Sequence, residues 1–230
     1  PSISEYATFA GNPIIYSDVK GDTVYIYSIY IPYTNWGPAL GGHTAISVKL
    51  EYDYKTHYYP ASGDDEFDVI PQIDRYGEND NLPSIEVPNE EKSMIMYAKR
   101  GEEVYKLGIV LPEKVEVDLA SVIQDYNYRL KGITNDNAPG QWCTLQCKNL
   151  LIDSFKDNGY SEEESQNYVD KLIPGIFPSA VPTNEKDAKK RGYSSIEYID
   201  YDNNTNKIIR NKKTWESDEK FNKNDVKSNN

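Results

Sequence analysis

The sequence predicts an α+β fold, in which an antiparallel sheet is covered on its faces by a few helices. Two observations predict it. Short segments in the first half of the chain alternate apolar and polar residues, as a half-buried strand does. Segments in the second half repeat apolar residues every three or four positions, which is the spacing of an amphipathic helix.

Most of the predicted strands lie in the first half of the chain, and their segments are rich in Tyr, Ile and Val. They span residues 23 to 31, 43 to 54, 56 to 59, 94 to 98 and 104 to 111. Residues 43 to 54 and 56 to 59 are predicted to pair as a hairpin. Residues 61 to 92 contain three prolines and no sustained period, which predicts a long surface excursion with one short strand.

Two helices are predicted from apolar periodicity and from residues that start or end helices. Asp118 is a good N-cap for a helix that ends before Gly132. A second helix begins between Thr144 and Cys147, and Gly159 is expected at its C-terminal end. Both cysteines of the chain lie at or near the start of this second helix.

A third helix and a last strand complete the prediction. Ser161 and Glu164 form a capping box, and Pro174 ends the helix that they start. A strand follows at residues 195 to 201. The predicted α+β domain covers residues 1 to 202.

Charge is distributed unevenly along the chain, whose formal net charge is -12. Residues 64 to 91 hold ten carboxylates and one arginine, whereas residues 203 to 230 carry seven basic and four acidic residues. We expect the latter segment to be a flexible polar tail. The acidic domain argues against a nucleic-acid partner, which normally needs clustered Lys and Arg. No apolar run is long enough for a transmembrane segment.

Cysteine and histidine are scarce, and their positions suggest chemistry. His43 opens a predicted strand, His57 lies on the neighbouring strand, and Cys143 and Cys147 lie near a helix start. Thiol catalysis requires a cysteine, a histidine base within hydrogen-bond reach and a third group that orients the imidazole. A helix N-terminus lowers the pKa of a thiol placed there.

Three short stretches resemble a known family. They read GGHTAISV at residues 41 to 48, THYYP at residues 56 to 60 and CKNLLIDSFKDNG at residues 147 to 159. Together they resemble the circularly permuted papain-like thiol hydrolases of the NlpC/P60 superfamily. That group includes the lecithin retinol acyltransferase-like proteins and the permuted peptidase or amidase domains of bacterial toxins.

The resemblance implies roles for individual residues. His43 matches the base, Cys147 the nucleophile and His57 the orienting group. Gln146 and Gln141 are candidates for the oxyanion hole, and Cys143 is the alternative nucleophile.

The implied function is a cysteine-dependent hydrolase that cleaves an amide bond in peptidoglycan or in a target protein and needs no cofactor. The resemblance and a composition rich in Asn, Lys, Ile and Tyr favour a secreted bacterial effector or toxin, with an inhibitory (immunity) protein as a partner. A lipid acyltransferase or phospholipase of the same fold is the first alternative. A non-catalytic, acidic, Tyr-rich binding domain is the second.

Two structural readings of the cysteines and histidines, and one reading of the acidic segment, compete with catalysis. The two thiols and two imidazoles would suffice for a tetrahedral zinc site, although their spacing is unusual for one. Residues 74 to 81 offer oxygen ligands for calcium, without the spacing of an EF-hand. A disulfide between Cys143 and Cys147 would close a very short loop and gain little chain entropy.

Overall fold

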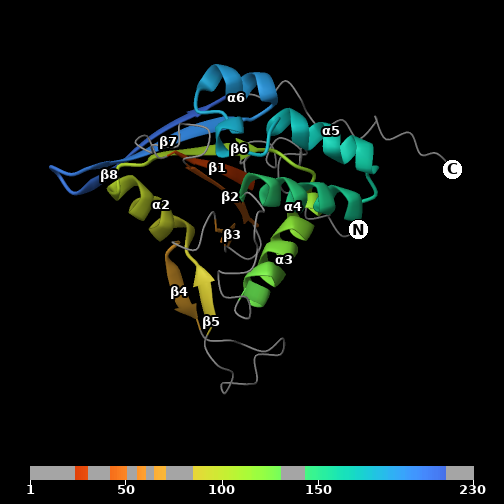
Figure 1. Cartoon of the computed structure of the whole chain (residues 1–230), viewed down its shortest axis with the longest axis horizontal. Coiled ribbons are helices and arrows are strands. Elements are labelled where there is room, and N and C mark those ends of the chain that lie inside the picture. Colours follow the sequence, from red (N-terminus) through yellow and green to blue (C-terminus); the bar gives the residue numbers. More distant parts are fainter. Residues whose placement is uncertain are drawn as a thin grey trace, which may run out of the picture.

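A six-stranded antiparallel sheet forms the centre of the computed structural model, which describes residues 24–30, 42–50, 56–60, 65–70, 85–130 and 143–215. The strand order is β3-β2-β1-β6-β7-β8 (Figure 1). The strands are β1 (Val24–Tyr30), β2 (Gly42–Lys49), β3 (Thr56–Tyr59), β6 (Glu103–Ile109), β7 (Ser195–Asp202) and β8 (Lys207–Thr214). This architecture confirms the predicted α+β class.

Helices cover the two faces of the sheet unequally (Figure 1). They are α2 (Glu90–Lys99), α3 (Glu113–Leu130), α4 (Cys143–Asp157), α5 (Glu162–Leu172) and α6 (Glu185–Arg191). Buried residues of α3, α4, α5 and α6 join one core cluster with the sheet, and buried residues of α2 join a second cluster. We call the two sides of the sheet the α4 face and the α2 face.

Alternation along the strands assigns each side chain to one of these faces. On β2, Ile46 and Val48 belong to the core cluster of the α4 face, and Ala45 belongs to that of the α2 face. Cross-strand partners share a face, so Ile29 of β1, which lies in the α2-face cluster, places its partner His43 on that face. The faces therefore decide which candidate site residues can meet.

Helix α2 occupies the segment where the sequence predicted a strand at residues 94 to 98, so that prediction is wrong. The Asn89 side chain caps the helix by accepting a hydrogen bond of 2.9 Å from the backbone N–H of Lys92. Met94, Tyr97 and Ala98 are buried at helical spacing. A short apolar stretch fits either period, and the start signal at Asn89 favours the helix.

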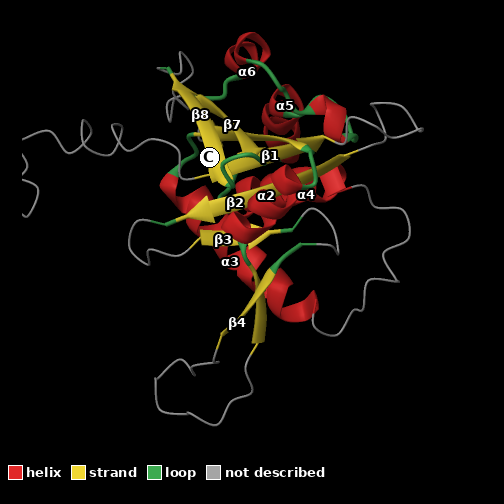
Figure 2. Cartoon of the chain, turned by 90° about the vertical axis from the view of Figure 1, so that its left-hand side faces the viewer, coloured by secondary structure: helices red, strands yellow, loops and turns green. Residues whose placement is uncertain are grey.

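The acidic excursion contains two strands where one was predicted. β4 (Phe67–Ile70) pairs antiparallel with β5 (Ile85–Pro88) in a separate two-stranded sheet. Both views show this pair projecting from the body of the molecule (Figures 1 and 2). Phe67 and Val69 of β4 are 40% and 68% exposed.

The other predicted helices are confirmed, with two changed starts. Helix α3 starts at Glu113, ahead of the predicted Asp118, and α4 starts at Cys143, one residue before the predicted range. Gly159 has a positive φ of 84° just after α4, as its predicted position at the helix end requires. The capping box of Ser161 and Glu164 is present at α5.

The predicted tail begins with a strand instead. Residues 207 to 214 form β8, which pairs with β7 over its whole length, so the expectation of a flexible segment is wrong for them. The tight turn before it is stabilised by Asp202, whose carboxylate accepts hydrogen bonds from the Asn204 N–H and the Thr205 hydroxyl. Residues 216 to 230 lie outside the described part of the chain.

Candidate functional site

The first turns of helix α4 dock on one residue of strand β2, Thr44. The backbone N–H of Thr44 donates to the sulfur of Cys143 over 3.3 Å, and the thiol of Cys147 donates to the Thr44 carbonyl oxygen over 3.4 Å. The hydroxyls of Thr44 and Thr144 are hydrogen-bonded at 2.8 Å. All three polar groups of Thr44 therefore bond to α4.

This docking explains why two thiols lie four residues apart. Strand β3 pairs with β2 from Ile46 to Lys49, so the ladder between them does not reach Thr44. Peptide groups at a sheet edge need partners when they are buried. Cys143 and Cys147 are one helical turn apart on one side of α4, and they supply an acceptor and a donor to the two peptide groups of Thr44.

Cys147 is a buried core residue. Its side chain is 0% exposed and packs in the core cluster of the α4 face. Burial raises the pKa of the Cys147 thiol well above its ordinary value, and the nearby Cys143 adds to the rise. A fully buried thiol that donates to a backbone carbonyl cannot meet a substrate, so this geometry contradicts the choice of Cys147 as the nucleophile.

Cys143 has the better position for a nucleophile. It is the first residue of α4 and is partly exposed. Burial still raises the pKa of its thiol, while hydrogen bonds from the Thr44 N–H and from Thr144 act in the opposite direction. The net shift of the Cys143 pKa is therefore upward, which is opposite to the direction expected for a thiol at a helix start.

His43 lies next to Thr44 in the chain and faces the other side of the sheet. Its ring centroid is 6.0 Å from that of Tyr97, a residue of α2. The Thr44 nitrogen is two covalent bonds from the His43 Cα, so the 3.3 Å contact to Cys143 places the Cys143 sulfur within about 6 Å of that Cα. The sulfur approaches this point of β2 from the sheet edge, and the imidazole approaches it from the α2 face.

His57 does not join this arrangement. It pairs with Val48, five residues beyond His43 along β2, which is a distance of about 17 Å at the usual strand rise. It also lies on the α4 face, opposite to His43. The predicted triad of Cys147, His43 and His57 therefore does not assemble, and Tyr97 is the aromatic group beside His43.

The predicted oxyanion-hole residues have different outcomes. Gln146 lies on α4, and its amide oxygen accepts a hydrogen bond from the Tyr59 hydroxyl. Gln141 lies outside the described residues. The backbone N–H groups at the start of α4 are the remaining donors beside Cys143, since a helix leaves its first N–H groups without intrahelical partners.

The start of β2 is also covered by the turn η2 (Pro178–Ala180). A Cβ at Gly42 would come within 2.5 Å of the Ile29 carbonyl oxygen and 3.3 Å of the Pro178 Cβ. Only glycine fits this close approach of backbone and turn. The preceding loop exposes Ile176, which is 39% accessible.

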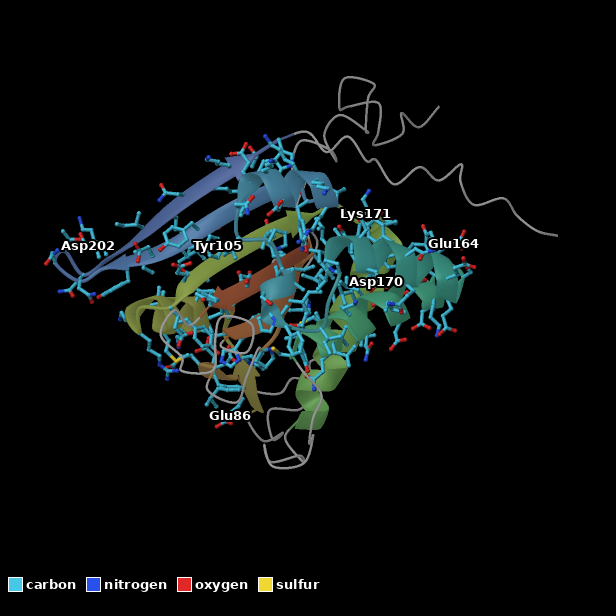
Figure 3. The ribbon with its side chains drawn as sticks, turned by 45° about the horizontal axis from the view of Figure 1, so that its top comes forward. Glu86, Tyr105, Glu164, Asp170, Lys171 and Asp202 are labelled. Atoms are coloured by element: carbon cyan, nitrogen blue, oxygen red, sulfur yellow. The ribbon has the colours of Figure 1, made fainter. Side chains whose placement is uncertain are left out.

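Helix α4 is held at its other side by an ion pair to α5. Lys148 is only 5% exposed, and its ammonium pairs with the carboxylate of Asp170, which is marked in Figure 3. The partnered ammonium lowers the Asp170 pKa against the opposing effect of burial, which is the largest single influence on that carboxyl. Lys148 directly follows Cys147, so this pair holds α4 against α5 next to the buried thiol.

The α2 face carries a second polar cluster, which is built for packing. The Tyr27 hydroxyl bonds to Ser47 at 3.1 Å and to the Glu90 carboxylate, and Lys106 bonds to Glu90 at 2.7 Å. Tyr58 donates to Asp65 over 2.7 Å. Because these groups satisfy one another, Tyr27 and Tyr58 are explained as sheet packing.

Within the described ranges, no group of three or more His, Cys, Asp or Glu residues is arranged to hold a metal ion. The zinc alternative fails because His43 and His57 lie on opposite faces. Both cysteines are free thiols, so the disulfide alternative is not realised. The candidate calcium segment at residues 74 to 81 lies outside the described residues.

No protein-family model, curated protein or solved structure matches the chain. The resemblance to permuted papain-like hydrolases therefore rests on the three short sequence motifs alone. Among the helices that the structure describes, none has the length and apolar character needed to span a bilayer.

Proposed function

We propose that the chain is a thiol-dependent hydrolase in which Cys143 is the nucleophile and His43 the base. One observation carries the proposal: a partly exposed thiol at the first residue of a helix is held at the N–H of the residue that follows His43. The two residues that we propose as nucleophile and base thus lie at one end of β2. An imidazole is long enough to reach the sulfur from its Cα in a suitable rotamer.

The reaction starts from the neutral thiol. His43 takes the thiol proton while the Cys143 sulfur adds to the carbonyl carbon of an amide, and backbone N–H groups at the start of α4 hold the oxyanion. Collapse breaks the C–N bond, and His43 returns the proton to the leaving amine. Water, activated by His43, then cleaves the thioester and regenerates the thiol.

We propose a peptide or peptidoglycan-like amide as the substrate, in keeping with the resemblance to toxin-type domains. A secreted bacterial effector with an inhibitory protein as a partner fits this substrate class. The exposed carboxylates of Glu66 and Glu86 offer such a partner charged groups to recognise.

The test compares three variants on an activated ester, on a peptide mixture and on peptidoglycan. Cys143→Ala should abolish turnover, and His43→Ala should reduce it by about 100-fold or more. Cys147→Ala is the matched control, because it removes the neighbouring buried thiol and should keep activity. Retained turnover in Cys143→Ala would refute the proposal.

A lipid ester is the alternative substrate for the same site. The exposed Ile176 belongs to the loop that leads into η2, which packs against the start of β2, and an apolar group there favours an acyl chain. Turnover of phospholipid vesicles in place of peptides would favour this alternative. It would leave the roles of Cys143 and His43 unchanged.

A non-catalytic binding domain is the second candidate. Phe67 and Val69 expose apolar surface on the projecting β4–β5 pair, beside the exposed carboxylates of Glu66 and Glu86. Exposed apolar side chains within a charged rim are typical of an interaction surface. Full inertness of Cys143 toward alkylation and every acyl substrate would favour this reading.

A further inference from the structure

The hydroxyls of Thr44 and Thr144 form a buried pair between the sheet and the helix start. Both residues are 0% exposed, and the two oxygens are 2.8 Å apart. Each hydroxyl has one proton to donate. If the Thr44 hydroxyl donates to Thr144, the proton of the Thr144 hydroxyl is directed to another acceptor.

The sulfur of Cys143, the preceding residue, is the candidate acceptor. It accepts a hydrogen bond from the Thr44 N–H over 3.3 Å, and the side chain and the backbone N–H of Thr144 both act to lower the pKa of this thiol. Thr44 thus contacts the sulfur directly through its backbone and indirectly through the hydroxyl pair. The Thr44 carbonyl is bonded to Cys147, so it does not compete for these protons.

We propose that the Thr44–Thr144 hydroxyl pair aims a hydroxyl proton at the Cys143 sulfur and thereby stabilises the thiolate as it forms. Thr144 acts on the sulfur, and Thr44 is the positioning residue that orients Thr144. The catalytic use of this arrangement rests on the proposed function. The hydrogen-bonding role itself is a property of the thiol and is measurable without a substrate.

Packing alone does not require hydroxyl groups at positions 44 and 144. Two apolar side chains of similar shape fill a buried contact without leaving an unsatisfied group. Instead, two hydroxyls lie at the one point where β2 meets the residue after the nucleophile. A hydrogen bond to a charged sulfur is stronger than one between neutral groups, so the pair favours the thiolate over the thiol.

The test measures the pH midpoint of iodoacetamide alkylation at Cys143, with mass spectrometry reporting Cys143 and Cys147 separately. Thr144→Val removes the hydroxyl and should move the midpoint up by about one pH unit. Thr144→Ser retains the hydroxyl and should leave the midpoint unchanged. Thr44→Val removes only the orienting partner and should move the midpoint in the same direction by a smaller amount.

Two results would overturn the inference. One is an unchanged midpoint in Thr144→Val, and the other is an equal shift in Thr144→Ser, which would assign the effect to packing. Circular dichroism checks that each variant is folded. If Thr144→Val does not fold, Thr44→Val decides the question, because an unchanged midpoint there also refutes the orienting role.

Turnover of the activated ester separates this inference from the proposed function. If the parent protein shows no Cys143-dependent turnover and the alkylation shift is present, the hydrolase proposal fails while the hydroxyl pair keeps its role. If turnover depends on Cys143 and the midpoint does not move, the failure is confined to the hydroxyl pair.

Discussion

Replacing Cys147 by alanine should weaken the fold while sparing the reactive thiol. The variant deletes a buried sulfur from a 0% exposed position and leaves the Thr44 carbonyl without its thiol donor. Removing one buried heavy atom costs about 1 kcal/mol, by analogy with Ile→Val changes. Leaving a buried acceptor without a partner costs about 1–3 kcal/mol. The free energy of unfolding should therefore fall by about 2–4 kcal/mol.

Cys143→Ala is the comparison that makes this prediction specific. It also removes one hydrogen bond to Thr44, but Cys143 is partly exposed, so water can replace the lost acceptor. A loss of about 1 kcal/mol is expected. Equilibrium urea unfolding followed by circular dichroism measures both values, with the denaturant slope checked for each variant.

The two variants should separate stability from reactivity. Cys147→Ala lowers stability more and keeps an alkylatable thiol, whereas Cys143→Ala lowers stability less and loses it. The reasoning fails if Cys147→Ala is as stable as the parent. It also fails if Cys147→Ala removes the reactive thiol while Cys143→Ala keeps it.

Three further predictions follow from particular residues. Burial raises the pKa of both thiols, so the folded state favours their protonated form. This contribution to stability should be complete below the ordinary thiol pKa of about 8.5 and should be lost as pH rises above it. Urea unfolding midpoints measured across this range should decline less in Cys147→Ala than in the parent protein. Gly159 has a φ of 84°, with open space where a Cβ would lie. In Gly159→Ala the free energy of unfolding should therefore fall by about 1–2 kcal/mol through backbone strain alone. Gly159→Asn, measured by the same urea unfolding, should lose less. Hydrogen bonds from Lys189 and Lys213 lower the pKa of Glu185 to about 2. The Glu185 pKa should be higher in Lys213→Met, as measured by a carboxylate NMR titration. An unchanged Glu185 pKa would contradict the placement of β8 beside α6.

The sheet was the most predictable part of the fold, because alternation reports a half-buried strand directly. β1, β2, β3, β6 and β7 fall where the sequence placed them. Helix α2 was missed because its apolar stretch is short enough to fit both periods. Strand β8 was missed because its side chains are mostly exposed, so no apolar alternation marks it.

The candidate site was only partly predictable. The sequence identified the scarce residues and the end of β2 where His43 lies. It favoured Cys147 over Cys143 as the nucleophile, because both lie near the helix start and only the docking on Thr44 shows which one is buried. His57 was assigned to the site from its position on a neighbouring strand. Its register opposite Val48 places it on the other face, and register is set by long-range pairing.

Thr44 and Thr144 left no signal in the sequence, since threonine is common in strands and near helix starts. Their structural role depends on a contact between residues 100 positions apart in the sequence. A pattern search along the chain examines neighbours in sequence, so it cannot detect such a pair.

The same separation governs when the site forms during folding. The bonds that hold Cys143 and Cys147 to Thr44 join residues 99 and 103 positions apart, so a long loop must close before either thiol meets its partner. Contacts of this range form slowly, because loop closure costs chain entropy before any contact offsets it. A growing chain that has already made β1, β2 and β3 carries only half of the arrangement. The thiol at position 143 acquires its partners at Thr44 only once α4 has been made and has docked against the sheet.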